Sequence, residues 1–171
     1  MAVHKQGMRA MEKNMQTYYS VDEQTTLAAA GELAARLRAG DIVLLRGDLG
    51  AGKSVFARGL ARGWGIAGHV TSPTFTTMQQ YSGPRGNFYH FDLYRMDDPE
   101  ELFETGLNEY IGGDGLAVIE WPENAELDPE DAYTVRIERV AAEEAPAGLR
   151  GAPEDGCVRR ITITAPGEAE A

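Results

Sequence analysis

The sequence predicts an α/β fold with three layers, in which a mostly parallel central sheet is extended by antiparallel strands near the C-terminus. Two short, continuous apolar runs, 42–45 and 116–119, are typical of strands that are buried on both faces of a parallel sheet. Strand and helix patterns alternate between residues 41 and about 120, which favours helices on both faces of that sheet. Segments 133–139 and 158–164 alternate apolar and polar residues and therefore predict half-exposed antiparallel strands.

The remaining elements follow from local patterns. Ser20 and Glu23 match a capping box, which predicts the start of a helix, and Gly40 is expected to stop that helix. The other expected elements are a strand at 17–20, a helix over 27–37, a helix through 56 to about 64, strands at 78–81 and 88–92, a helix start at 99–103, a turn at 112–115 and a surface loop at 141–156. Together they predict one domain at 17–165, between tails at 1–16 and 166–171.

The 171-residue chain is strongly acidic. It has 16 Lys and Arg and 27 Asp and Glu, for a net charge of −11, so we do not expect it to hold nucleic acid by itself, because phosphate binding needs a basic surface. Cys157 is the only cysteine, which excludes an internal disulfide and a zinc site built on several thiolates. No apolar run is long enough to span a membrane. We therefore expect a cytoplasmic protein that does not act in a membrane.

Residues 47–54, GDLGAGKS, match the phosphate-binding loop (P-loop) pattern G-x-x-x-x-G-K-[ST]. Chance would produce this pattern in about one chain in 300 of the same composition, and here it follows a buried strand and precedes an amphipathic helix. Glycines let backbone N–H groups surround a phosphate, and the N-terminus of the next helix favours an anion. Lys53 would neutralise the β- and γ-phosphates, and the Ser54 hydroxyl would bind Mg²⁺. The motif therefore predicts the P-loop NTPase fold.

The expected nucleotide contacts within this loop are Gly47, Asp48, Leu49, Gly50, Ala51, Gly52, Lys53 and Ser54. A P-loop enzyme also needs a carboxylate near the metal ion, at the carboxyl end of a strand. Asp92 follows the apolar end of one predicted strand and Glu120 follows the apolar run 116–119, so both are candidates. Glu120 fits the metal-binding position best, and either acid could position the attacking water.

Three nearby features have both a functional and a structural interpretation. Trp121 is either an aromatic wall for the nucleotide or ordinary packing. The hydroxyl-rich segment 71–77 is either a switch that senses the γ-phosphate or a polar loop. His90 lies inside a predicted strand, which favours a structural role.

Several motifs occur in a fixed order: GDLGAGKS at 47–54, SPTF at 72–75, HFDLYR at 90–95, DPEEL at 98–102 and VIEW at 118–121. As a set they closely resemble the TsaE (YjeE) family, the bacterial ATPase of threonylcarbamoyladenosine modification of tRNA. The resemblance covers about residues 20 to 140. The chain departs from the family pattern at Ser54, where threonine is common, and at Phe75, where tyrosine is common; either hydroxyl at position 54 serves a metal ion.

The resemblance implies a protein that binds ATP and Mg²⁺, hydrolyses ATP slowly, and works with the TsaB and TsaD proteins, which transfer threonylcarbamoyl to adenosine 37 of tRNA. The tRNA would be contacted only through those partners. Lys53, Asp92 and Glu120 would be the catalytic groups. The implied roles are Lys53 on phosphate, Ser54 and Glu120 on Mg²⁺, Asp92 near the γ-phosphate, Trp121 lining the nucleotide site, Glu23 touching the nucleotide, and Ser72 and Thr74 in a switch-like loop.

Other functions share a phosphate-binding loop. A small-molecule kinase is the main alternative, although no arginine-rich lid segment is present. A regulatory GTPase would need an N/T-K-x-D motif, which is absent because Lys53 is the only lysine after residue 13. A binding module gated by nucleotide, in which hydrolysis is incidental, would carry the same loop.

Overall fold

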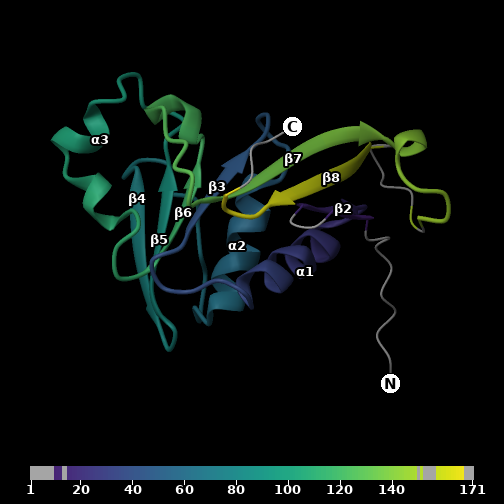
Figure 1. The fold of residues 1–171 in the computed structure, drawn as a ribbon, viewed down its shortest axis with the longest axis horizontal. Helices are drawn as coiled ribbons and strands as arrows, with labels where there is room; N and C mark the ends of the chain where they lie inside the picture. The colour runs from purple at the N-terminus through teal and green to yellow at the C-terminus, as the bar shows by residue number, and fades with distance from the viewer. Residues whose placement is uncertain (1–9, 13–14, 150, 152–156, 168–171) are drawn as a thin grey trace.

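The protein folds around one central sheet, shown in Figure 1 as a computed structural model that describes residues 10–12, 15–149, 151 and 157–167. Within these residues, eight strands form the sheet in the order β1-β2-β8-β7-β3-β6-β5-β4. The strands are β1 (Ala10–Glu12), β2 (Met15–Ser20), β3 (Ile42–Arg46), β4 (Met78–Gly83), β5 (Gly86–Asp92), β6 (Leu116–Glu120), β7 (Tyr133–Ala141) and β8 (Cys157–Thr164). The helices are α1 (Glu23–Ala34), α2 (Lys53–Trp64), α3 (Glu101–Glu104) and the 3₁₀ turns η1 (Leu107–Tyr110), η2 (Pro122–Ala125) and η3 (Ala142–Glu144).

The four strands at the centre of the sheet, β7, β3, β6 and β5, run parallel to one another. Antiparallel strands extend the sheet at both ends, with β8, β2 and β1 beyond β7, and β4 beyond β5. The predicted parallel centre and the antiparallel C-terminal strands are confirmed. The N-terminal strand β2 pairs with β8, so the two ends of the described chain meet in one edge of the sheet.

Helices cover both faces of the sheet, which gives the three predicted layers (Figure 1). Side chains alternate along a strand, so each central strand contributes to two cores. In β3, Val43 and Leu45 pack with α1 and α2, whereas Ile42 and Leu44 pack with α3 and η2 on the other face. The face covered by α1 and α2 holds the larger core and determines where the first residues of α2 lie.

Two glycines of α2 allow it to lie close against α1. A Cβ atom at Gly59 would lie 2.6 Å from Cβ of Ala30, and one at Gly63 would lie 2.6 Å from Cβ of Ala34. Such distances are shorter than a van der Waals contact, so a larger side chain at either glycine would push the helices apart. The close packing fixes α2 on the sheet with its N-terminus beside the end of β3.

The predicted capping box at Ser20 and Glu23 is wrong. Helix α1 begins at Glu23, and its N-cap is Asp22, whose Oδ1 accepts a hydrogen bond from the Thr25 amide at 2.7 Å. Hydrogen bonds from the side chain and amide of Thr25 lower the pKa of the Asp22 carboxyl. An ionised carboxylate is a stronger acceptor than a hydroxyl and also interacts favourably with the helix N-terminus, so Asp22 takes the capping position. Ser20 instead donates to the Asp22 carbonyl at 2.7 Å.

Several boundaries differ from the predicted ones. The predicted tail 1–16 contains β1 and the start of β2, which pair with each other, so ordered structure begins before residue 17. The remainder of that tail, residues 168–171 of the predicted C-terminal tail, and residues 150 and 152–156 of the predicted loop 141–156 lie outside the described residues. Helix α1 ends at Ala34 rather than Leu37, and β7 continues to Ala141, which pairs with Cys157 of β8.

Candidate functional site

The loop between β3 and α2 has the backbone conformation that its glycines allow. Gly47, Gly50 and Gly52 have φ angles of +146°, +75° and +117°, where other residues are strained. A Cβ atom at Gly47 would also collide with the carbonyl oxygen of Ile137 on β7. Gly52 is the N-cap of α2 and offers no side chain, so the first amides of α2 carry no side-chain cap. The loop therefore presents uncapped N–H groups at a helix N-terminus, which is the arrangement that binds an anion.

Lys53 lies at the centre of this loop. Its side chain is almost fully buried, with 5% of the residue exposed, and Nζ donates to the carbonyl oxygens of Gly47 and of Asp48, the latter at 3.0 Å. Nζ also lies 3.9 Å from the ring centroid of Trp121. Burial lowers the pKa of the Lys53 ammonium, and the nearby carboxylates, Glu120 first, act in the opposite direction. The lysine is thus enclosed by its own loop and an aromatic ring.

Trp121 joins β6 to η2 in an unusual conformation. Its φ of +59° lies in the left-handed region, which is uncommon for a bulky residue and is retained where surrounding contacts over-determine it. The ring contacts Lys53 and packs 4.9 Å from the Tyr94 ring, centroid to centroid. Trp121 therefore forms a wall beside the loop, and its predicted contact with a nucleotide stays a prediction.

The two candidate acids lie side by side. Strands β5 and β6 are parallel neighbours, and their register pairs Asp92 with Glu120 at the carboxyl edge of the sheet. Paired residues on adjacent strands project from the same face, so both side chains point toward the α2 layer. The Ser54 hydroxyl, in the first turn of α2, donates to Oε2 of Glu120 at 3.2 Å. Glu120 is 2% exposed.

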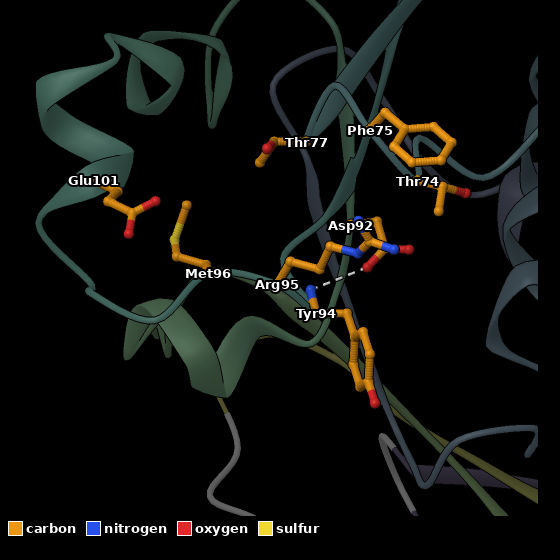
Figure 2. A pocket seen from close by; sticks show the side chains of 8 residues that line it. All are labelled: Thr74, Phe75, Thr77, Asp92, Tyr94, Arg95, Met96 and Glu101. Atoms are coloured by element: carbon orange, nitrogen blue, oxygen red, sulfur yellow. Dashed lines mark hydrogen bonds between the residues drawn. The ribbon is translucent and has the colours of Figure 1, made fainter.

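Asp92 is half-buried and contacts the loop 71–77 (Figure 2). Its Oδ2 accepts a hydrogen bond from the Ser72 hydroxyl at 3.1 Å, and its Oδ1 accepts one from the Tyr94 amide at 3.0 Å. The Thr74 hydroxyl donates to the Ser72 carbonyl at 3.4 Å. The structure thus brings the predicted residues Ser72, Thr74 and Asp92 into one cluster.

A cavity of about 160 Å³ opens beside Asp92. Figure 2 shows Asp92, Tyr94 and Arg95 at the end of β5, while Glu101 enters from α3. The Arg95 guanidinium lies 5.3 Å from the centroid of the Phe75 ring, and Phe75 is 87% exposed. The cavity therefore leaves room for water or a substrate group next to the Asp92 carboxylate.

Two contributors to the site were missed or placed in a minor role by the sequence analysis. Nε2 of His90 lies 2.9 Å from Oε1 of Glu120, and both residues are buried. The Arg139 side chain, on β7, donates to the carbonyl of Gly50 at 3.1 Å and so holds the tip of the loop. His90 precedes Asp92 by two positions in the same strand, and this period-two relation is the sequence signal that could have identified it.

Glu23 lies outside this cluster of contacts. It occupies the first turn of α1 and forms an ion pair with Arg58 of α2, with 2.8 Å between Oε1 and the guanidinium. Arg58 follows Ser54 by about one helical turn, so this ion pair joins the first turn of α1 to the second turn of α2. Its predicted contact with a nucleotide stays a prediction.

The residues at the site suit Mg²⁺ with phosphate better than a metal held by protein alone. Among the described residues, no group of three or more His, Cys, Asp or Glu side chains could hold a metal ion. Magnesium, however, is usually bound by one or two protein oxygens together with phosphate oxygens and water. Ser54 Oγ and Glu120 Oε2 supply such a pair beside the anion-binding amides. In the part of the chain that the structure describes, no helix is long and apolar enough to cross a membrane.

Comparisons with known proteins agree with this architecture. The family model for "Threonylcarbamoyl adenosine biosynthesis protein TsaE" matches residues 20–146. A crystal structure of Bacillus subtilis YdiB superposes with a TM-score of 0.67 and 31% sequence identity, covering 91% of this chain and 88% of that chain.

Curated relatives carry the same family name. The tRNA threonylcarbamoyladenosine biosynthesis protein TsaE of Bacillus subtilis is 38% identical over 149 residues, which are 86% of this chain and 84% of that protein. The protein of the same name from Treponema pallidum is 46% identical over 106 residues, 61% of this chain and 78% of that protein. The chain therefore belongs to the TsaE family of tRNA threonylcarbamoyladenosine biosynthesis proteins.

Proposed function

We propose that this protein binds ATP with Mg²⁺, hydrolyses it slowly, and thereby supports TsaB and TsaD in threonylcarbamoylation of adenosine 37 of tRNA. The observation that carries this proposal is the contact between Ser54 Oγ and Glu120 Oε2, 3.2 Å apart and next to Lys53. A hydroxyl, a carboxylate and an ammonium at the N-terminus of a helix are the groups that a magnesium–triphosphate complex requires. The family membership supplies the pathway in which such a site would act.

Each group would have a separate task. The amides of residues 50–54 and the Lys53 ammonium would bind the phosphates, and Ser54 with Glu120 would hold Mg²⁺. The bound ion would neutralise charge on the β- and γ-phosphate oxygens. Asp92 would orient the attacking water, because it lies beside Glu120 in the register of β5 and β6 and is only half-buried, whereas Glu120 is almost fully enclosed. Trp121 would cover Lys53 and keep water away from the phosphates.

The charge of the chain supports an indirect role with tRNA. A net charge of −11 repels a phosphate backbone, so we propose that TsaB and TsaD make the contacts with tRNA. In this arrangement the protein supplies the energy of ATP and its partners supply the substrate binding.

The test combines nucleotide binding with a reconstituted reaction. Calorimetry with ATP and Mg²⁺ should show binding by the wild type and a loss of about 100-fold or more in affinity for Lys53→Ala, since several charge-assisted hydrogen bonds are removed. Arg62→Ala is the matched control, because it removes one positive charge from the other end of α2. Phosphate release should be slow for the protein alone and should change when TsaB and TsaD are added.

Three results would count against the proposal. The first is absence of ATP binding by the wild type. The second is an equal effect of Arg62→Ala and Lys53→Ala on ATP affinity. The third is the appearance of a phosphorylated small molecule at ordinary kinase rates, which would favour the alternative function of a small-molecule kinase.

A further inference from the structure

We infer that His90 is a positioning residue that holds Oε1 of Glu120 and thereby aims Oε2 at Ser54 and the Mg²⁺ site, an inference that rests on the proposed function. Sequence reasoning favours a purely structural histidine at this position. The surroundings of the ring point to a more specific task, which can be measured separately from folding.

The positions of His90 and Glu120 on adjacent strands support this inference. His90 lies on β5 and Glu120 on β6, and His90 shares its face of the sheet with Asp92, two residues further along the strand. Nε2 of His90 lies 2.9 Å from Oε1 of Glu120, with 1% and 2% of the two residues exposed. A hydrogen bond between two side chains on adjacent strands, both shielded from water, restricts the rotation of the carboxylate.

The surroundings of the two His90 ring nitrogens indicate which of them carries the proton. Within the described residues, Nδ1 of His90 is buried and has no hydrogen-bond partner. With the proton on Nδ1, that nitrogen would be a buried donor without an acceptor, and the unprotonated Nε2 would set its lone pair against Oε1 of Glu120. A proton on Nε2, in contrast, faces the Oε1 atom of Glu120. The geometry therefore favours the tautomer that donates from Nε2 to Oε1 of Glu120.

The two oxygens of the Glu120 carboxylate have different partners. Oε1 accepts from His90, and Oε2 accepts from the Ser54 hydroxyl. Burial lowers the pKa of the Lys53 ammonium, and among the nearby carboxylates Glu120 acts against this most strongly, so the two charges lie close together. Without His90 the carboxylate could turn toward the ammonium, and the two charges would then neutralise each other instead of serving cation and phosphate. His90 thus keeps one oxygen occupied and leaves one oxygen for the metal ion.

The experiment measures how much Mg²⁺ strengthens ATP binding. Calorimetry on the full chain gives the ATP dissociation constant in EDTA and in saturating Mg²⁺, and their ratio is the Mg²⁺ enhancement. His90→Phe keeps a ring but removes the donor, and we expect it to lower the enhancement about tenfold, as loss of a partner of a metal ligand does. The dissociation constant in EDTA should stay within about twofold of wild type, since the anion-binding loop is intact.

Two further variants separate positioning from packing. His90→Gln can place an amide donor near the Nε2 position, so we expect it to recover most of the enhancement. Tyr89→Phe is the matched control, because it removes a hydroxyl bond to Asp114 from the adjacent residue, which faces the opposite side of the sheet. This control should leave the enhancement unchanged.

The outcomes distinguish this inference from the proposed function. A wild type that binds no ATP in either condition overturns the proposed function together with the Mg²⁺ role of His90. If the wild type binds ATP, two results overturn the inference alone. One is a wild-type Mg²⁺ enhancement in His90→Phe, and the other is no recovery of the enhancement in His90→Gln. If His90→Phe does not fold, His90→Gln and the wild-type ¹⁵N spectrum still decide, because a proton found on Nδ1 rather than Nε2 contradicts the inference.

Discussion

The tips of β5 and β6 are paired in register and carry one acid each, but the two acids have different surroundings. Glu120, at the tip of β6, is 2% exposed, and both of its oxygens accept hydrogen bonds from regular elements: His90 on β5 and Ser54 on α2. Asp92, at the tip of β5, is half-buried. One of its oxygens accepts from Ser72, which lies on the loop 71–77.

The difference indicates a division between a fixed acid and a responsive one. Moving Glu120 would break contacts with a strand and with the helix that follows the phosphate loop. Asp92 is bonded to loop 71–77 through its side chain and through its amide, which donates to the Thr77 carbonyl at 2.9 Å. Thr77 has a φ of +62°, which is unfavourable for a β-branched residue, so the backbone of this loop is strained at Thr77. Glu120, at the end of β6, is suited to bind a metal ion. Asp92, at the end of β5, is suited to connect the reaction with the conformation of loop 71–77.

Removal of the charge at the fixed tip should have the largest effect. We expect Glu120→Gln to lower ATP turnover about 1000-fold, because a poorly held Mg²⁺ loses several kcal/mol of charge stabilisation, while ATP binding in EDTA persists. Phosphate release and repeated tRNA modification cycles with TsaB and TsaD provide the measurements. Glu126→Gln, which removes an exposed charge six residues away, is the control. Repeated cycles sustained by Glu120→Gln would show that hydrolysis is incidental, in favour of a nucleotide-gated binding module.

The same change at the responsive tip should affect turnover but not metal binding. We expect Asp92→Asn to lower turnover about 100-fold, the scale of a lost general base, and to leave the Mg²⁺ enhancement of ATP affinity near that of wild type. Asp97→Asn removes an exposed charge five residues away and is the control. If Asp92→Asn and Glu120→Gln reduce the Mg²⁺ enhancement equally, the two tips do not have separate tasks.

Local patterns were sufficient for most of the fold and for the loop. The runs 42–45 and 116–119 are continuous and apolar because parallel central strands are buried on both faces, and that signal is independent of distant residues. The glycines and lysine of 47–54 form a contiguous motif. The neighbouring positions of Asp92 and Glu120 followed from one general rule, that carboxyl ends of parallel strands share an edge.

The remaining features depend on pairing between distant segments. The bond between His90 and Glu120 joins residues 30 positions apart and requires the register of β5 against β6. The N-cap depends on which of two nearby acceptors, Ser20 or Asp22, binds the first amides of α1, and a motif search does not compare them. Trp121 has a left-handed backbone and contacts Lys53 and Tyr94, residues that lie far from it in the sequence, so a local pattern does not predict this arrangement.

A smaller change tests the connection between the responsive tip and its loop. Ser72→Ala removes the hydroxyl that donates to Oδ2 of Asp92, and loss of about 1 kcal/mol at this half-exposed bond should lower turnover about fivefold. Ser82→Ala is the control, because its hydroxyl bonds to Asn87 at the opposite end of β5. Steady-state phosphate release measures both variants. Unchanged turnover in Ser72→Ala would mean that Asp92 acts without the loop.

The smallest effect is expected where the fixed tip meets α2. Ser54 is exposed, so Ser54→Thr adds a methyl group without a clash and retains the hydroxyl. We therefore expect the turnover of Ser54→Thr to stay within about twofold of wild type. Ser54→Ala loses the hydroxyl and should lower the Mg²⁺ enhancement of ATP affinity about tenfold. A marked loss in Ser54→Thr would show that the hydroxyl must stay directed at Glu120, and that the fixed tip includes the first turn of α2.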